Sequence, residues 1–70
     1  MMPLTMTHSG IQSSIKKVSG SDDIRMFLKT LGFIVGSPVT VITKIDGNII
    51  VSIKEARIAV SKEIAGKIYV

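Results

Sequence analysis

Few side chains in this sequence could carry out catalysis. The chain has one histidine, His8, and no cysteine. A catalytic triad needs a nucleophile, a base and an orienting acid held together, and no acidic residue lies near His8 in the sequence. Without cysteine there is no thiolate nucleophile, thiolate metal site or disulfide. We therefore expect that the protein is not an enzyme and that His8 is a solvent-exposed residue.

The acidic residues are explained by local structure. Asp22 and Asp23 could form an acid–base pair or ligate a metal, but they lie at the start of a predicted helix, where carboxylates favour the positive end of the helix dipole. The run Asp46-Gly47-Asn48 lacks the ligand spacing and the terminal glutamate of a calcium loop, so it predicts a turn. The glycines match neither a phosphate-binding loop nor a dinucleotide fingerprint.

Metal and cofactor binding receive little support from the sequence. Aspartate, glutamate and histidine together number six in the whole chain. A dedicated transition-metal site within one subunit is therefore not expected, and no cofactor is predicted. A weak site shared between subunits, built from His8 and carboxylates, is the alternative, and it would make the chain a metal-binding regulator.

The basic residues are dispersed along the chain. Nine basic and five acidic residues give a net charge of +4, which is compatible with nucleic acid, an anionic membrane surface or an acidic protein. Barrels that bind nucleic acid usually add aromatic stacking platforms to a basic groove, and here Tyr69 is the one plausible platform. No nucleic-acid partner is expected, although a small nucleic-acid-binding barrel remains the alternative to a protein-binding one.

The apolar composition predicts a mostly β fold. Apolar residues make up 46% of the chain, and they include 12 isoleucines and 7 valines against three leucines and three alanines. β-Branched residues fit a pleated, half-buried surface, and the abundance of aliphatic residues excludes a disordered chain. Seventy residues form one domain, residues 1–70. A core of this size without disulfides is marginally stable, so burial against a partner is one way to stabilise it.

The sequence contains no targeting or membrane signal. No apolar run approaches the roughly 20 residues of a membrane span. The first eight residues lack a basic region and a long apolar region, so they do not resemble a signal peptide. We expect a cytoplasmic, unprocessed chain without a membrane span.

One α-helix of roughly ten residues is predicted after residue 20. Ser19 and Ser21 are both suitable N-caps, and Ser19 with Asp22 resembles a capping box. Gly32 is placed to adopt a left-handed conformation after the last turn. Met26 lies on the side opposite to the predicted inward face. Four apolar residues at helical spacing form that inward face: Ile24, Phe27, Leu28 and Leu31.

The strongest β pattern is a hairpin formed by residues 39–45 and 49–53. A two-residue turn at Asp46-Gly47 would place the apolar residues of the two strands on opposite faces. A three-residue loop pairs Val41 with Ile53 and places these residues on one face. We therefore predict the three-residue loop, or an equivalent bulge.

Weaker patterns complete the fold. Residues 4–6 predict a short edge segment, and residues 14–18 and 57–60 predict strands. Residues 61–66 predict one capped helical turn, and residues 67–70 a terminal strand. About five short strands with one inserted helix close most economically as a small, partly open barrel.

Several apolar residues have no certain place inside so small a barrel: Met26, Phe33, Ile34, Ile42 and Ile50. A contiguous apolar group beside basic residues marks a protein contact. The loop Phe33-Ile34-Val35 at the end of the helix is the best local candidate, with core packing as its equally weighted alternative. The candidate partner-binding residues are Arg25, Met26, Lys29, Phe33, Ile34 and Val35.

The order of these features resembles the family of ferrous iron transport protein A (FeoA). A helix ending in Leu31-Gly32, a short apolar loop, Gly36 and an alternating strand follow the family's pattern. The likeness continues downstream through Gly47, residues 49–53, 57–60 and 63–65, and upstream through Leu4, Gly10 and Ile15. Two positions depart from it: Val35 stands where the family often has proline, and Glu55-Ala56 replaces a frequent glycine. These departures leave room for a relative, the C-terminal domain of iron-dependent repressors.

The resemblance implies a fold and a role. It implies an SH3-like barrel that acts as a cytosolic accessory or regulator of ferrous iron uptake. The family partner is FeoB, a membrane permease with a cytosolic G-domain. The resemblance implies no residue-level functional set, and the chain could be a monomer or a homo-oligomer.

Overall fold

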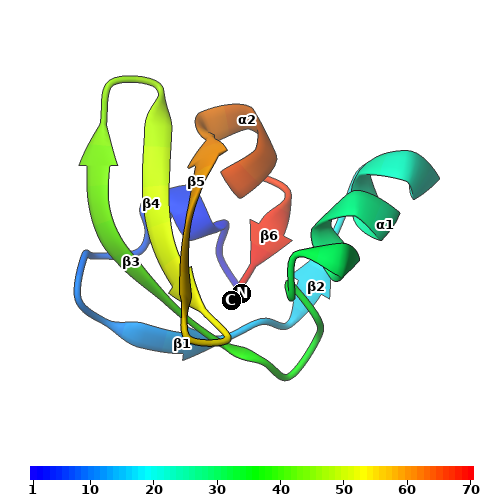
Figure 1. The fold of residues 1–70 in the computed structure, drawn as a ribbon, viewed down its shortest axis with the longest axis horizontal. Helices are drawn as coiled ribbons and strands as arrows, with labels where there is room; N and C mark the ends of the chain where they lie inside the picture. Colours follow the sequence, from blue (N-terminus) through cyan, green and yellow to red (C-terminus); the bar gives the residue numbers. More distant parts are fainter.

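The computed structural model describes residues 1–70, in which two antiparallel sheets share one core (Figure 1). The elements in chain order are η1 (a 3-10 helix, Leu4–Met6), β1 (Gln12–Ser14), β2 (Lys17–Val18), α1 (Asp22–Thr30), β3 (Pro38–Ile45), β4 (Asn48–Ile53), β5 (Ala56–Ser61), α2 (Lys62–Ala65) and β6 (Ile68–Tyr69). The first sheet has the order β1-β3-β4-β5, and β2 pairs with β6 in the second. The predicted mostly β fold with one inserted helix is confirmed.

The core is built from alternating residues of the central hairpin and from one or two residues of most other elements. Val39 of β3 pairs with Ile53 of β4, and Val41 pairs with Val51. All four side chains are buried because they share the inner face of the sheet. The other buried apolar residues are Leu4, Ile15, Leu28, Phe33, Ile49, Val60, Ala65 and Ile68.

The hairpin contains a bulge, and the predicted three-residue loop is wrong. The predicted pairing of Val41 with Ile53 is wrong as well, because Val41 pairs with Val51. Asp46 and Gly47 form a two-residue turn with φ values of 27° and 45°, which is typical of hairpin turns that match strand twist. This turn pairs Ile45 with Asn48 and leaves Ile45 exposed. The register then shifts between Val41 and Thr43, so the alternative of an equivalent bulge is confirmed.

The strand predicted over residues 14–18 is two strands in different sheets. β1 pairs with β3, whereas β2 pairs with β6. The change occurs at Ile15, whose side chain is buried and whose amide donates to the carbonyl of Ser37 at 3.0 Å. The next amide, of Lys16, donates to the carbonyl of Tyr69 at 2.7 Å. The chain therefore passes from one sheet to the other around a buried corner residue.

The predicted edge segment at residues 4–6 is instead the helical turn η1. Leu4 is part of the core, and the Thr7 hydroxyl donates to the Leu4 carbonyl at 2.9 Å. The amides of Met6 and Thr7 donate to the carbonyls of Pro3 and Leu4 at 3.0 and 3.2 Å. These local hydrogen bonds and the buried Leu4 side chain replace strand pairing in this segment. The later elements are confirmed: β5 contains residues 57–60, the Ser61 hydroxyl caps α2, and Ile68 of β6 is buried.

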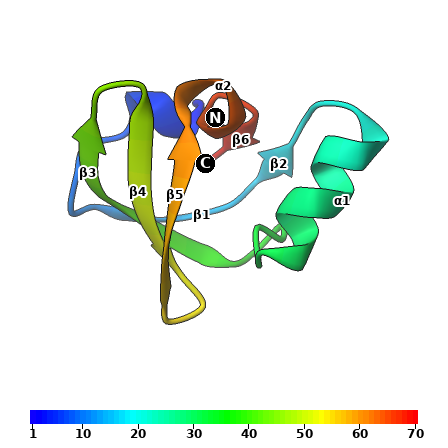
Figure 2. The ribbon, with the colours of Figure 1, turned by 45° about the horizontal axis from the view of Figure 1, so that its top comes forward.

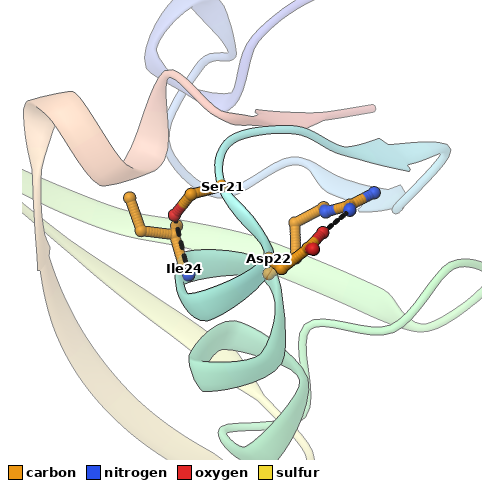
Figure 3. A network of polar contacts seen from close by, with 4 residues as sticks. Ser21, Asp22 and Ile24 are labelled. Atoms are coloured by element: carbon orange, nitrogen blue, oxygen red, sulfur yellow. Dashed lines mark hydrogen bonds and ion pairs between the residues drawn. The ribbon is translucent and has the colours of Figure 1, made fainter.

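Ser21 is the N-cap of α1, and its hydroxyl accepts a hydrogen bond from the Ile24 amide at 3.2 Å (Figure 3). The predicted capping box is wrong, because the Ser19 hydroxyl donates to the carbonyl of Lys67 at 3.2 Å. Gly32 follows the helix with a φ of 104°, as predicted. Its positive φ lets the chain leave the helix without the steric penalty of a Cβ.

The inward face of α1 is narrower than its apolar spacing predicts. Leu28 is completely buried, and Ile24 and Leu31 are partly buried against the core. Phe27 is 56% exposed, so its placement on the inward face is wrong. α1 meets the barrel along one narrow stripe, and Phe27 lies at the margin of that stripe.

Candidate protein-binding surface

Helix α1 projects from the side of the barrel (Figures 1 and 2). Leu28 is the one buried residue among its nine. Met26, on the side opposite to Leu28, is 70% exposed. A nine-residue helix is too short to be stable in isolation, since isolated helices shorter than about 12–15 residues are marginal in water. Packing of its inner stripe against the core, together with the caps at its two ends, must therefore hold α1 in place.

The C-terminal end of α1 is held by a Schellman motif. The amide of Phe33 donates to the carbonyl of Leu28 and that of Gly32 to the carbonyl of Lys29, both at 3.0 Å. This motif turns the chain back toward the barrel and directs Phe33 into it. Phe33 is 2% exposed and is the residue of largest volume among those with buried side chains. The prediction that Phe33 binds a partner directly is therefore wrong. Phe33 is a core residue, which was the alternative interpretation of this loop.

The two residues after Phe33 remain outside. Ile34 is exposed and Val35 is 64% exposed. The amide of Ile34 donates to the carbonyl of Gly32 at 2.9 Å, and the amide of Ser37 donates to the carbonyl of Ile34 at 2.9 Å. The loop is thus held by backbone hydrogen bonds while its apolar side chains face solvent.

The structure brings most of the predicted candidate residues together around one hollow. We call it the α1 hollow; it has a volume of about 270 Å³ and is lined by Val18, Arg25, Lys29, Phe33, Ile34 and Val35. Met26 lines the adjoining hollow with Asp22, Arg25 and Lys29. Arg25 and Lys29 border both hollows because they lie one helical turn apart on the same side of α1.

Sequence reasoning missed two residues of this region, Val18 and Phe27. Val18 belongs to β2. The sequence predicts a single strand over residues 14–18, so it gives no indication that Val18 lies beside α1. Phe27 fitted the helical spacing of the core face, and its exposure depends on how far α1 stands from the barrel. Ile42 and Ile50, which also had no certain place, are partly buried in the hairpin.

The charged side chains of the α1 region are exposed to solvent, including the one ion pair, between Arg25 and Asp22. Arg25 pairs with Asp22 one turn earlier on the helix (Figure 3). Both side chains are largely exposed, and exposed pairs of this kind stabilise a helix by about 0.5 kcal/mol or less. This pair therefore leaves Arg25 able to exchange Asp22 for another carboxylate.

The remaining chemistry-bearing residues are not assembled into a site. His8 is exposed and lines a separate, largely apolar hollow together with Met2, Met6 and Ile11. No three histidine, aspartate or glutamate residues are close enough together to hold a metal ion. Asp46 and Gly47 form a turn and belong to no such cluster. Exposed apolar side chains therefore gather in two places, and of these the α1 region is the one whose hollow is also lined by charged side chains, Arg25 and Lys29.

The FeoA domain model matches residues 2–70. The chain belongs to the FeoA family. This family is associated with ferrous iron transport. None of the curated protein sequences matches the chain significantly.

Solved structures of FeoA proteins share the fold. A crystal structure of an iron uptake regulatory protein (FeoA) is 27% identical with a TM-score of 0.87, over 96% of this chain and 89% of that chain. The FeoA of Stenotrophomonas maltophilia, crystallised with zinc and described as an SH3 domain protein, is 23% identical with a TM-score of 0.84, over 99% of this chain and 88% of that chain. The predicted SH3-like barrel is confirmed.

The predicted relationship to metal-dependent repressors is confirmed at the level of the fold. A manganese-dependent transcriptional repressor aligns with a TM-score of 0.88 and 20% identity. The match covers 97% of this chain and 39% of the repressor. No helix of the structure is both long and apolar enough to cross a membrane.

Proposed function

We propose that this FeoA-family protein is a cytosolic, non-catalytic accessory of ferrous iron uptake that binds the cytosolic part of a FeoB-type permease. The observation that carries the proposal is helix α1, which projects from the barrel with one buried residue. Its outer side and the following loop form the docking surface, which we call the α1 surface. It consists of Arg25, Met26, Phe27, Lys29, Ile34 and Val35.

Apolar exposure on the α1 surface supports a protein partner. Met26, Phe27, Ile34 and Val35 are all exposed. Burying apolar surface gains about 25 cal/mol per Å², so covering these side chains would contribute to binding. Aromatic residues, methionine and arginine are also the types enriched at protein interfaces.

A binding role fits the absence of an assembled catalytic group. His8 and all five acidic residues are exposed, so none of them has the buried, oriented environment that a general acid or base requires.

The proposal is tested with the FeoB-type permease encoded in the same genome, inserted in nanodiscs and titrated with the purified protein. The wild type should bind, and the double variant Met26→Ser/Val35→Ser should bind about tenfold more weakly, because two exposed apolar contacts are lost. The matched control is Ile45→Ser, which removes an exposed apolar side chain at the hairpin tip. Its affinity should equal that of the wild type.

Two outcomes would contradict the proposed function. One is the absence of binding by the wild type at tens of micromolar, with the G-domain tested both empty and loaded with nucleotide. The other is binding that Ile45→Ser weakens while Met26→Ser/Val35→Ser leaves it unchanged. The second outcome would move the docking surface to the opposite side of the barrel.

A further inference from the structure

The α1 hollow combines an apolar lining with two cationic side chains. Val18, Ile34 and Val35 supply the apolar lining together with the edge of Phe33, and Arg25 and Lys29 stand on the helix side. Its volume is about 270 Å³, whereas a cavity of about 150 Å³ already accommodates a benzene molecule. One large apolar side chain therefore fits this hollow.

The end of the molecule that carries the hollow has most of the net positive charge, and two of its basic residues, Arg25 and Lys29, line the hollow. β2 lies between β6 and α1 (Figure 2). Five of the nine basic residues belong to these elements or adjoin them, against two of the five acidic residues. This end of the molecule therefore holds three of the four net positive charges. The five basic residues are Lys16, Lys17, Arg25, Lys29 and Lys67.

Arg25 and Lys29 set the spacing of a complementary partner. They lie four residues apart on α1, which corresponds to about 6 Å along a helix axis. Two carboxylates at i and i+4 of a partner helix have the same spacing. A large apolar residue at position i+3 of that helix lies about a quarter turn to one side of the two carboxylates, and would point into the hollow beside α1.

A protein segment suits this surface better than a lipid bilayer or a nucleic acid. A bilayer presents a broad surface, whereas the apolar lining is concave, and Asp22 and Asp23 are exposed on the first turn of α1. Nucleic-acid binding without sequence preference uses aromatic stacking platforms. The hollow offers no such platform, because its one aromatic residue, Phe33, is buried and the exposed Phe27 does not line it.

We infer that the α1 hollow binds an acidic, amphipathic helical segment that inserts one large apolar side chain beside Val18 and Val35 and pairs two carboxylates with Arg25 and Lys29. This inference rests on the proposed function, because it names the chemistry of the partner's docking segment. Charge complementarity of this kind raises the association rate and makes the affinity depend on salt.

The probe is a synthetic helical peptide that carries one leucine between two glutamates four residues apart. In a titration followed by NMR, amide shifts should concentrate at Val18, Lys29 and Val35. Raising the salt from about 0.05 to 0.5 M should weaken binding about tenfold, because screening shortens the reach of exposed charges. A peptide with both glutamates replaced by lysine should bind at least about tenfold more weakly.

Charge reversal in the protein provides the matched comparison. Arg25→Glu/Lys29→Glu should lose about tenfold or more in affinity for the glutamate peptide, whereas Lys44→Glu/Lys62→Glu should lose less than about threefold. Both double variants change the net charge equally. Lys44 and Lys62 are exposed residues outside the α1 region.

The inference is overturned if the two peptides bind equally, or if the shifts fall outside the α1 hollow. It is also overturned if neither peptide binds at millimolar concentration while phosphatidylglycerol vesicles bind the wild type and not Arg25→Glu/Lys29→Glu. The permease experiment keeps the two proposals apart. If Arg25→Glu/Lys29→Glu still binds the permease as the wild type does, the inference of an acidic docking segment is refuted and the proposed function stands. If the wild type binds the glutamate peptide but not the permease, the permease is refuted as the partner and the inference about the hollow stands.

Discussion

The amide of Phe33 donates a hydrogen bond to the carbonyl of Leu28 at 3.0 Å, and both side chains are buried in the core. This hydrogen bond joins Leu28, the residue that anchors α1, to the second residue after the C-cap Leu31, as a Schellman motif requires. It ends the helix and sends Phe33 inward, so that Ile34 and Val35 emerge beside the outer face of α1. One backbone hydrogen bond thus links the core to the candidate docking surface.

Gly32 lies inside this motif and is expected to be sensitive to substitution. Its φ is 104°, and a Cβ there would lie 2.9 Å from Cγ of Lys54. Gly32→Ala should therefore lower the free energy of unfolding by about 1–2 kcal/mol, through backbone strain and this close contact. Urea denaturation measures the loss.

Gly10→Ala is the control for Gly32→Ala. Gly10 has a φ of 87°, but a Cβ there would meet no atom within 4 Å. Gly10→Ala should thus retain the backbone strain without the contact and lower the stability by a smaller amount. Equal stability of Gly32→Ala and the wild type would show that the helix does not end as described.

The sequence was sufficient to predict elements whose signal is local. The Ser21 N-cap of α1, the presence of a turn after Ile45 and the alternation in residues 49–53 each depend on neighbours within a few positions. The length of that turn is predicted wrongly, and a bulge is predicted only as an alternative, without the position between Val41 and Thr43 that the structure gives it. Its position could not be read from the sequence because it depends on the fit between two strands and the core.

The turn between β4 and β5 is expected to be strained. Lys54 and Glu55 have φ values of 51° and 65°, a left-handed conformation that costs a residue with a Cβ about 1–2 kcal/mol. Glu55→Gly should therefore raise the free energy of unfolding by about 0.5–1 kcal/mol, because part of the relief is offset by the greater entropy of the unfolded glycine. Thermal denaturation measures the change.

The turn between β3 and β4 supplies the reverse experiment. Gly47 occupies the equivalent second position with a φ of 45° and open space around a Cβ. Gly47→Ala should lower the stability by about 1 kcal/mol. A fall in melting temperature for Glu55→Gly together with no change for Gly47→Ala would contradict the strain argument.

Ser21 and Ser19 are expected to stabilise different parts of the fold. Ser21→Ala removes the N-cap of α1 and should cost about 1 kcal/mol. Ser19→Ala removes the hydrogen bond to the Lys67 carbonyl and should cost about 0.5–1.5 kcal/mol. Hydrogen exchange separates them, because Ser21→Ala should speed exchange in α1 and Ser19→Ala should speed it in β2 and β6. If exchange in α1 were faster in Ser19→Ala and unchanged in Ser21→Ala, Ser19 rather than Ser21 would be the N-cap of α1.

The candidate site was predicted in part because its residues are close in sequence. Arg25, Met26, Lys29, Ile34 and Val35 lie within eleven positions, and a helix followed by a short loop must keep them together. Burial could not be predicted in the same way. Whether Phe27 or Phe33 enters the core depends on the angle at which α1 meets the barrel, and that angle is set by distant partners in the fold.

Ile49 and Val35 are expected to separate stability from binding. Ile49→Val leaves a gap in the core and should lower the free energy of unfolding by about 0.5–1.5 kcal/mol. Val35→Ser lies on the exposed loop and should change the stability by less than about 0.5 kcal/mol. Affinity for the FeoB-type permease should respond in the opposite way, with Val35→Ser weaker and folded Ile49→Val close to wild type, because Ile49 lies in β4 and does not line the α1 hollow. If Ile49→Val, shown to be folded by circular dichroism, loses affinity more than Val35→Ser, partner binding depends on the core and the α1 surface is not the docking site.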